Sequence, residues 1–368
     1  MKPCLGLTRF VISSAIVATV LYGSTLLASD TYAVVDIGAL RGGSAIGRQV
    51  DNVSSAMVGS SGVTHGSHTR AFLWYPQRGI SDLGVLPGGD YSEGFAINDH
   101  GEVVGDSNTE KHLRGFLWSR KDGMRELKPF PGDLASRAYS INNASQVVGY
   151  SSGPHGVRAV LWLNSGRIQN LGTLPGGDYS EALAINNAGQ IVGFSTSMSG
   201  RHAFLWTRQD GMVDLGVLPG DTSSQARRIT DNGLVVGSSS GLRVTHAFLW
   251  SRQGGLQDIG ALPGSVYAEA LDANSSGKVV GASQTSLGGR AFIWSRGSGV
   301  QDLNSLVASD LDIVLVAAVG INERNQIVAI GSLHHDLTRD RQMHLDDESH
   351  AGPLHVFLLT SGSTPKTR

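Results

Sequence analysis

The residue types best suited to chemistry lie in polar turns that recur between short apolar segments. Two of these turns read Asp-Tyr-Ser-Glu, and a third keeps the tyrosine and the glutamate. An exposed tyrosine beside a carboxylate offers a flat apolar face and directional acceptors, which suits recognition of carbohydrate or peptide. The alternative is that each tyrosine simply packs over its own turn. This interpretation is favoured, because a lone aromatic residue usually belongs to the core or covers it. The candidate ligand-binding residues are Asp90, Tyr91, Glu93, Asp178, Tyr179, Glu181, Tyr267 and Glu269.

A second candidate site lies near the C-terminus, where histidines and carboxylates gather in residues 333–354. Imidazole and carboxylate groups are the ligand types that zinc and similar ions take, but their spacing here fits no fixed ligand pattern. Because the segment is long and polar, a solvated loop is the favoured interpretation, and the sequence predicts no cofactor. The candidate metal ligands are His334, His335, His344, Asp346 and His350.

Two charged positions recur once in almost every repeat of the chain. One interpretation is a ring of charge that faces a ligand. The other is a set of polar pairs that hold strands or neighbouring repeats in register, and we favour it because the set is evenly distributed. The basic position holds Arg70, Arg114, Arg158, His202, His246, Arg290 and His355, and the acidic position holds Asp36, Asp82, Glu126, Asp214, Asp258 and Asp302.

Signatures of catalysis are scarce, and the sequence predicts no catalytic residue. Residues 237–241 match Gly-x-Ser-x-Gly, but they fall at a repeated turn without the strand–turn–helix setting that exposes a nucleophile. The single cysteine, Cys4, lies in the N-terminal leader, so the mature chain is expected to have neither disulfides nor thiol chemistry. The only hints of an acid–base pair in a central funnel are charges that differ between repeats, namely Arg137, Arg227, Arg228 and Glu323.

Tryptophan reveals the elements that must position these residues. The six tryptophans, from Trp74 to Trp294, stand at intervals of 44 residues. A fixed period of this size is typical of a propeller or another repeat array. In the unit around Trp206 we expect short strands at 181–185, 190–194, 202–206 and 212–215, separated by turns rich in Gly and Asn. Residues 203–206 are apolar on both faces, which favours a sheet stacked between other sheets.

The two ends of the chain predict how the repeats are arranged. Residues 32–38 match the fourth strand of a unit, and residues 355–359 match the third. Pairing them would remove exposed sheet edges at both ends. We therefore predict an all-β fold, a seven-bladed β-propeller of four-stranded blades whose ring is closed by the N-terminal strand. An open β-solenoid is the alternative. The last unit is interrupted by the long loop 333–354.

The repeat resembles a known family. Residues 202–204 and 246–248 both read His-Ala-Phe, the motif that names the HAF-type extracellular repeats of bacteria, and the surrounding stretches 186–193 and 214–220 fit the same pattern. The resemblance covers residues 32–359. It implies an exported protein of tandem β-rich repeats, and it implies neither an established activity nor catalytic residues.

The N-terminus has the features of a secretory signal peptide. Lys2 and Arg9 are followed by an apolar stretch, and small residues at 28–29 mark a cleavage point. An uncleaved membrane anchor is the alternative, because residues 10–28 could just cross a bilayer. We expect cleavage and no membrane span afterwards. The predicted parts are a signal peptide at 1–28, the propeller at 29–360 and a polar tail at 361–368.

Charge and composition narrow the function. A net charge of −2 argues against nucleic-acid binding, which needs a clustered basic surface. The sequence predicts a monomeric, secreted or periplasmic, non-catalytic recognition or scaffold propeller. Its expected partner is an extracellular ligand, either a glycan or a cell-envelope protein. A propeller-type glycan hydrolase or lyase acting outside the cytoplasm is the alternative, because propellers host such enzymes as well.

Overall fold

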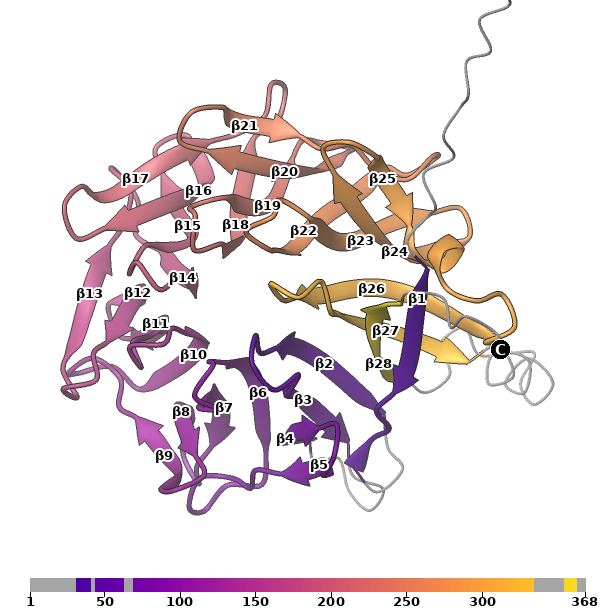
Figure 1. Ribbon diagram of the computed structural model, residues 1–368. Coiled ribbons are helices and arrows are strands. Elements are labelled where there is room, and N and C mark those ends of the chain that lie inside the picture. The colour runs from indigo at the N-terminus through magenta and orange to yellow at the C-terminus, as the bar shows by residue number, and fades with distance from the viewer. Residues whose placement is uncertain (1–30, 41–43, 63–68, 334–353, 363–368) are drawn as a thin grey trace, which may run out of the picture.

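Strands dominate the chain (Figure 1). The computed structural model describes residues 31–40, 44–62, 69–333 and 354–362. Short apolar segments bounded by Gly-, Pro- and Asn-rich turns form the strands, as a sequence of this kind predicts. A single 3-10 turn, η2 (Leu303–Leu306), begins after Asp302. Within the described ranges, no helix has the length and apolar character needed to cross a membrane.

The described strands form seven sets of four, called units 1 to 7. Within each unit neighbouring strands pair antiparallel, and one bridge between Thr245 and Tyr267 joins units 5 and 6 into a larger sheet. Unit 1 contains β2 (Ala45–Val50), β3 (Met57–Gly62), β4 (Thr69–Tyr75) and β5 (Gly79–Asp82). Unit 2 contains β6 (Ser92–Ile97), β7 (Val103–Asn108), β8 (Leu113–Ser119) and β9 (Gly123–Leu127). Unit 3 contains β10 (Ala135–Ile141), β11 (Val147–Gly153), β12 (Gly156–Trp162) and β13 (Ile168–Gly172).

The remaining units repeat this order. Unit 4 contains β14 (Ser180–Ile185), β15 (Ile191–Ser197), β16 (Gly200–Thr207) and β17 (Gly211–Gly216). Unit 5 contains β18 (Ser223–Ile229), β19 (Val235–Ser240), β20 (Thr245–Ser251) and β21 (Gly255–Asp258). Unit 6 contains β22 (Tyr267–Ala273), β23 (Val279–Thr285), β24 (Gly288–Ser295) and β25 (Gly299–Asp302). Unit 7 contains β26 (Ile313–Ile321), β27 (Ile327–Leu333), β28 (His355–Ser361) and β1 (Tyr32–Asp36).

Unit 7 is built from both ends of the chain. Its fourth strand is β1, which pairs antiparallel with β28 so that Tyr32 lies opposite Ser361 and Asp36 lies opposite Phe357. The expected signal peptide at 1–28, nearly all of the loop 333–354 and most of the tail 361–368 fall outside the described residues.

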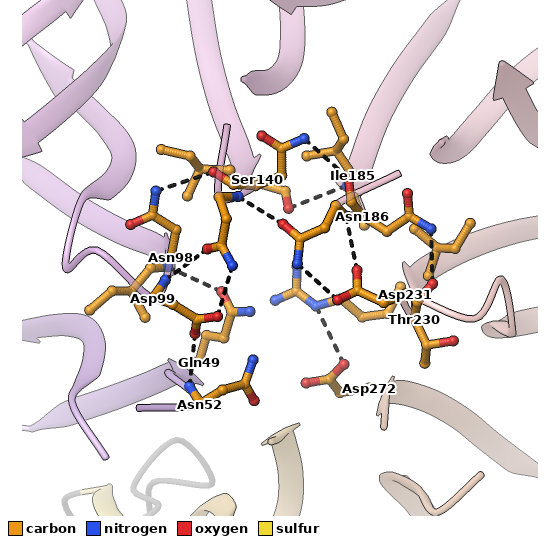
Figure 2. A pocket seen from close by; sticks show the side chains of 18 of the residues that line it. Gln49, Asn52, Asn98, Asp99, Ser140, Ile185, Asn186, Thr230, Asp231 and Asp272 are labelled. Atoms are coloured by element: carbon orange, nitrogen blue, oxygen red, sulfur yellow. Dashed lines mark hydrogen bonds and ion pairs between the residues drawn. The ribbon is translucent and has the colours of Figure 1, made fainter. Parts of the chain in front are cut away.

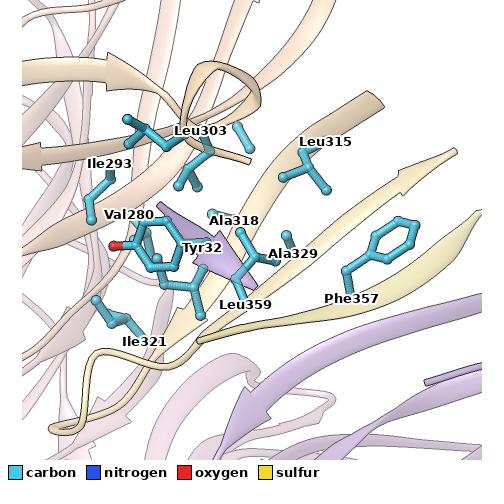
Figure 3. Close-up of a cluster of buried hydrophobic side chains, with 13 residues drawn as sticks. Tyr32, Val280, Ile293, Leu303, Leu315, Ala318, Ile321, Ala329, Phe357 and Leu359 are labelled. Atoms are coloured by element: carbon cyan, nitrogen blue, oxygen red, sulfur yellow. The ribbon is translucent and has the colours of Figure 1, made fainter. Parts of the chain in front are cut away.

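The units stand around a common centre, with the first strand of each unit nearest to it (Figure 1). Buried apolar clusters lie between neighbouring units, so each sheet is covered on both faces. Figure 3 shows the cluster between units 6 and 7, in which Tyr32 of β1 lies among side chains of both units. The all-β character and the stacking of sheets predicted from residues 203–206 are confirmed. The first strands, β2, β6, β10, β14, β18, β22 and β26, are called the inner strands below.

Phenylalanine, rather than tryptophan, is the most deeply buried repeated aromatic residue. Phe204 is fully buried, and Trp206 projects from the same face of β16 but lies nearer the end of the strand, where the neighbouring sheet covers less of it. The repeated tryptophans are therefore not all equally buried. Trp74, Trp162 and Trp206 are buried, whereas Trp118, Trp250 and Trp294 are half-buried.

A β-bulge interrupts every inner strand. In unit 4 the pairing with β15 shifts between Ala182 and Ala184, which leaves Leu183 as an extra residue. The repeated glycine of the second strand makes room for this bulge, because a Cβ on Gly193 would collide with the carbonyl oxygen of Glu181. A second shift in β26 leaves Val316 as a further extra residue. The extra residues at the position that all seven inner strands share are called the bulge residues, and they are Arg48, Phe95, Tyr139, Leu183, Arg227, Leu271 and Val319.

Candidate functional site

A cavity of about 400 Å³ lies where the inner strands converge. Every inner strand contributes its bulge residue to the wall, as expected of an irregularity that re-aims a side chain. These are also positions at which the repeats differ from one another. The lining residues are Arg48, Phe95, Arg137, Tyr139, Glu181, Leu183, Phe194, Arg227, Arg228, Leu271 and Val319.

One wall of the cavity stacks cations on aromatic rings. The guanidinium carbons of Arg48 and Arg137 lie 5.4 and 5.1 Å from the centroid of the Phe95 ring. Arg137 also lies 5.7 Å from the ring of Tyr139, which is itself 5.6 Å from Phe95. Contacts of this kind contribute roughly 0.5–1 kcal/mol each, and more where water is excluded. They hold the positive charges in fixed positions on the wall.

Each arginine of the cavity contacts a carboxylate of a neighbouring unit. Arg227 Nε lies 2.6 Å from Glu269 Oε1, and Arg228 Nε lies 3.8 Å from Asp272 Oδ1. The four pairs are Arg48–Glu93, Arg137–Asp106, Arg227–Glu269 and Arg228–Asp272.

The glutamates singled out in the sequence lie on the inner strands, near or at the cavity wall. Glu181 lines the cavity, and Glu93 and Glu269 lie behind Arg48 and Arg227. The tyrosine of each turn donates its hydroxyl hydrogen bond to the glutamate of the same turn. The bonds run from Tyr91 to Glu93 (2.9 Å), from Tyr267 to Glu269 (2.8 Å) and from Tyr179 to Glu181.

These tyrosines are held as neutral donors. Burial first, and the neighbouring carboxylate of Glu269 second, raise the pKa of the Tyr267 hydroxyl to about 12. The pKa values of Tyr91 and Tyr179 are raised in the same direction, again by burial first. The hydroxyl of Tyr139 donates a further hydrogen bond to Glu181, at 3.0 Å. The tyrosines therefore orient the glutamates.

The turn aspartates are engaged within their own units. Asp90 Oδ1 accepts from the amide of Asn108 at 2.6 Å, and Asp178 Oδ1 accepts from the hydroxyl of Thr196 at 3.1 Å. Both contacts fasten the turn before the inner strand to the second strand. Of the eight predicted binding residues, only Glu181 is a lining residue of the cavity.

Two buried aspartates bind their protons more tightly than usual. Burial raises the pKa of Asp106 to about 6, although Arg137 opposes the shift. Burial likewise raises the pKa of Asp272 to about 6 against the opposing effect of Arg228. Asp106 is fully buried, and its Oδ1 has no hydrogen-bond partner among the described residues.

Arg228 also lines a second, polar pocket of about 110 Å³ (Figure 2). Here the repeated asparagine, which follows five of the seven inner strands, joins neighbouring units. Asn98 Nδ2 donates to the carbonyl of Asn142, and Asn142 Nδ2 donates to that of Asn186, both at 3.1 Å. Where Thr230 replaces asparagine, Asn232 Nδ2 bonds the carbonyl of Ser275 instead. The repeated asparagine is therefore a connection between units.

The charged residues that differ between repeats are divided between the cavity and the polar pocket. Arg137, Arg227 and Arg228 line the cavity, whereas Glu323 lies at the polar pocket, where it accepts hydrogen bonds from Ser275.

Most of the evenly repeated charges pair within their own units, and Arg70 and Arg114 also donate to the backbone carbonyls of Asp90 and Leu134 in the next unit. Three basic residues contact the acidic position of the adjacent strand, and two others contact the aspartate of a turn. The first group is Arg114–Glu126, His202–Asp214 and His355–Asp36, and the second is Arg158–Asp133 and His246–Asp221. Asp214 also accepts from the amide of Gly216, and Asn170 does the same for Gly172, which explains why asparagine can replace the acid there.

The predicted metal ligands, His334, His335, His344, Asp346 and His350, fall outside the described residues. In the ranges that the structure does describe, no group of three or more His, Cys, Asp or Glu side chains could hold a metal ion.

Similar solved structures share the fold at very low sequence identity. Streptogramin B lyase has a TM-score of 0.54 and 10% identity, over 91% of this chain and 99% of the lyase. Oligogalacturonate lyase in complex with manganese has a TM-score of 0.52 and 9% identity, over 90% of this chain and 96% of the lyase. TolB from Acinetobacter baumannii has a TM-score of 0.46 and 12% identity, over 64% of this chain and 59% of TolB. No family model and no curated protein matches the sequence. The chain is an all-β protein with a propeller-like fold.

Proposed function

We propose that the chain is an exported, non-catalytic recognition protein, a closed seven-bladed β-propeller whose central cavity binds a saccharide. Each unit is one blade. Closure is supported by the pairing of β1 with β28 and by the hydrogen bond from Asn322 Nδ2 to the carbonyl of Asp51, at 2.8 Å. A buried cluster that combines side chains of the first and last blades supports it as well.

The observation that carries the binding proposal is the position of the bulge residues. Most repeated residues serve the blades: glycine admits the bulge, asparagine and serine link neighbouring blades, and histidine and aspartate hold strands and turns within a blade. The bulge residues differ between blades, and all of them line one cavity. A binding function requires such a break in symmetry, because one ligand does not present seven identical faces.

The chemistry of the wall favours a saccharide. The rings of Phe95 and Tyr139 and the side chains of Leu183 and Leu271 offer apolar surface to a sugar ring. Guanidinium groups and Glu181 supply directional partners for hydroxyl groups. The leader at 1–28 and the resemblance to HAF repeats support a location outside the cytoplasm, where glycans are displayed.

A larger side chain that fills the cavity tests whether the ligand binds there. Purified mature protein is screened against envelope and capsular glycans, together with Leu183→Trp in the cavity wall and Leu242→Trp at an exposed hairpin tip. We expect the wild type and the Leu242 variant to bind the same glycan, and Leu183→Trp to lose it while keeping its circular dichroism spectrum. Undiminished binding by a folded Leu183→Trp protein would place the site elsewhere.

A second candidate function is a glycan lyase or hydrolase, favoured by one specific pair of residues. Glu93 and Asp106 lie opposite each other in β6 and β7, and the raised pKa of Asp106 suits a general acid. Recognition is proposed first because Asp106 is fully buried behind Arg137, out of hydrogen-bonding reach of a ligand in the cavity. Turnover of any bound glycan that is abolished by Asp106→Asn would establish the enzyme instead.

A further inference from the structure

We infer that the cavity recognises an anionic saccharide, one that carries carboxylate or sulfate groups, through arginine side chains that face the ligand. The inference rests on the proposed function and specifies the class of ligand for the same cavity.

In each of the four ion pairs of the cavity, the arginine side chain is more exposed than the carboxylate side chain. The Arg137 side chain is 28% exposed and that of its partner Asp106 is 0% exposed. The Arg227 side chain is 38% exposed, against 9% for Glu269. The Arg48 and Arg228 side chains are likewise more exposed than those of their partners. Among the charged lining residues, a ligand entering the cavity therefore meets four guanidinium groups and the carboxylate of Glu181, whereas the carboxylates paired with the arginines lie behind them.

Packing between neighbouring units does not require these arginines. A buried ion pair is often no more stabilising than an apolar contact of the same size. The positions equivalent to Arg48 and Arg227 hold Leu183, Leu271 and Val319 in other units, and those units pack against their neighbours without a charge there. The arginines thus give the cavity a positive charge that the packing of its walls does not require.

The guanidinium groups are positioned for an anion. Arg227 contacts Glu269 through Nε, which leaves its two Nη groups for another partner. Arg48 and Arg137 are stacked on Phe95, so little conformational entropy is lost when they bind. A planar guanidinium matches a carboxylate or a sulfate with two parallel hydrogen bonds.

The arginines form two groups. Arg48 and Arg137 stand at blades 1 and 3, and Arg227 and Arg228 stand at blade 5. Between the two groups lie, on one side, Glu181, Leu183 and Phe194 of blade 4, and on the other side Leu271 and Val319 of blades 6 and 7. An oligosaccharide with charges on successive sugars can contact both groups while its ring faces cover the aliphatic side chains. We therefore expect an acidic oligomer to bind more tightly than an acidic monosaccharide.

The test compares ligands that differ only in charge. A uronic-acid oligomer, the same oligomer with its carboxylates reduced to primary alcohols, and a sulfated oligomer of similar length are titrated by calorimetry. We expect the uronic-acid oligomer, the sulfated oligomer or both to bind at least about tenfold more tightly than the reduced oligomer, a difference of about 1.4 kcal/mol. Added salt should weaken the binding of the charged oligomers alone.

Variants assign the effect to the cavity. Arg227→Gln and Arg137→Gln should each lose about tenfold in affinity for the charged oligomer, and clearly less than that for the reduced one, which forms only neutral hydrogen bonds with these side chains. Arg227→Lys keeps the charge and should retain part of the affinity. The control is Arg252→Gln, which removes an exposed arginine whose ion pair with Asp210 lies outside the cavity.

The outcomes separate this inference from the proposed function. Equal affinity for the charged and reduced oligomers would overturn the charge inference and leave saccharide recognition standing. Unchanged binding by folded Arg227→Gln and Arg137→Gln proteins would overturn it too. Preference for the sulfated oligomer alone would support it with sulfate as the recognised group. If none of the three oligomers binds, the inference is wrong, and the wider glycan screen decides the proposed function independently.

Discussion

Asp272 shows how one buried carboxylate connects three units. Its Oδ2 accepts from the backbone amide of Ile321 in unit 7 at 2.9 Å, and its Oδ1 faces Arg228 of unit 5. Burial outweighs both contacts and raises the pKa of the carboxyl to about 6 from the ordinary value of 3.8. Between these two values the native carboxyl is protonated while the unfolded chain is ionised there.

This difference predicts the pH dependence of stability at a single residue. The native state binds the extra proton, so the contribution of Asp272 to stability is complete below pH 3.8 and is lost as the pH rises to about 6. The free energy of unfolding of the wild type, minus that of Asp272→Asn, should fall by about 3 kcal/mol across this window and stay constant above it. Urea unfolding at a series of pH values measures it. A difference that is flat from pH 4 to pH 6 would contradict the proton uptake.

Single residues also show how far sequence reasoning reaches. Of the four divergent charges that hint at an acid–base pair, Arg137, Arg227 and Arg228 line the central cavity and Glu323 lies at the polar pocket. The roles of Tyr91 and Tyr179 as donors to glutamate were not foreseeable, because the direction of a side chain at a turn depends on the bulge that follows it.

The bulged inner strand is the element that makes the site. Without the extra residue, strict alternation would fix which side chains face the centre, and every second residue would follow the same pattern. The extra residue breaks the alternation and adds one more side chain to the cavity wall. In units 1 to 6 the bulge lies opposite the repeated glycine, where a Cβ would collide with a backbone carbonyl oxygen, whereas in unit 7 Ala329 takes this position.

Substituting that glycine should damage one element and leave others intact. A Cβ on Gly193 would collide with the backbone of Glu181 and Ala182, which cannot move aside as a flexible side chain would. We expect Gly193→Ala to lower the free energy of unfolding by ~1–3 kcal/mol, the range for overpacking. Gly297→Ala is the matched control, because nothing lies within 4 Å of a Cβ there. Equal stability of the two variants would contradict the proposed role of the glycine.

The two classes of repeated tryptophan should also differ in energy. Trp206 is buried in the cluster between units 3 and 4, whereas Trp118 is half-buried at the margin of its cluster. We expect Trp206→Ala to cost ~3–5 kcal/mol, as for large aromatic core residues, and Trp118→Ala to cost clearly less. Denaturant unfolding followed by far-ultraviolet circular dichroism measures both. The prediction fails if Trp118→Ala proves at least as damaging as Trp206→Ala.

The positions of the strands are predictable from the sequence. The strands of the unit around Trp206 were expected within three residues of their observed limits, because Gly- and Asn-rich turns mark their ends. The bulges were not expected. A shift of one residue in pairing is caused by the close approach of a carbonyl group to glycine, and hydrophobic alternation in a short strand does not record it.

The whole molecule is held together by contacts between sheets that are distant in sequence. Each buried cluster takes side chains from two units, so no unit buries its apolar faces by itself. The backbone amide of Glu323 donates to Asn52 across the junction of units 7 and 1, and Asn52 in turn donates to Asp99. We therefore expect unfolding to be cooperative around the proposed ring.

The contribution of β1 provides the most direct test of closure. Removing residues 1–38 takes Tyr32 out of the cluster between units 6 and 7 and leaves the edge of β28 unpaired. We expect the truncated protein to lose at least ~3 kcal/mol, the cost of removing a large aromatic core residue, and to aggregate through the exposed edge. A synthetic peptide of residues 31–38 should bind it saturably and restore the melting temperature. The same peptide with Tyr32→Ala should restore less, and a scrambled peptide should restore nothing. In an open array the end strand would stabilise only its own unit, so an unchanged unfolding midpoint for the rest of the chain after truncation would contradict closure.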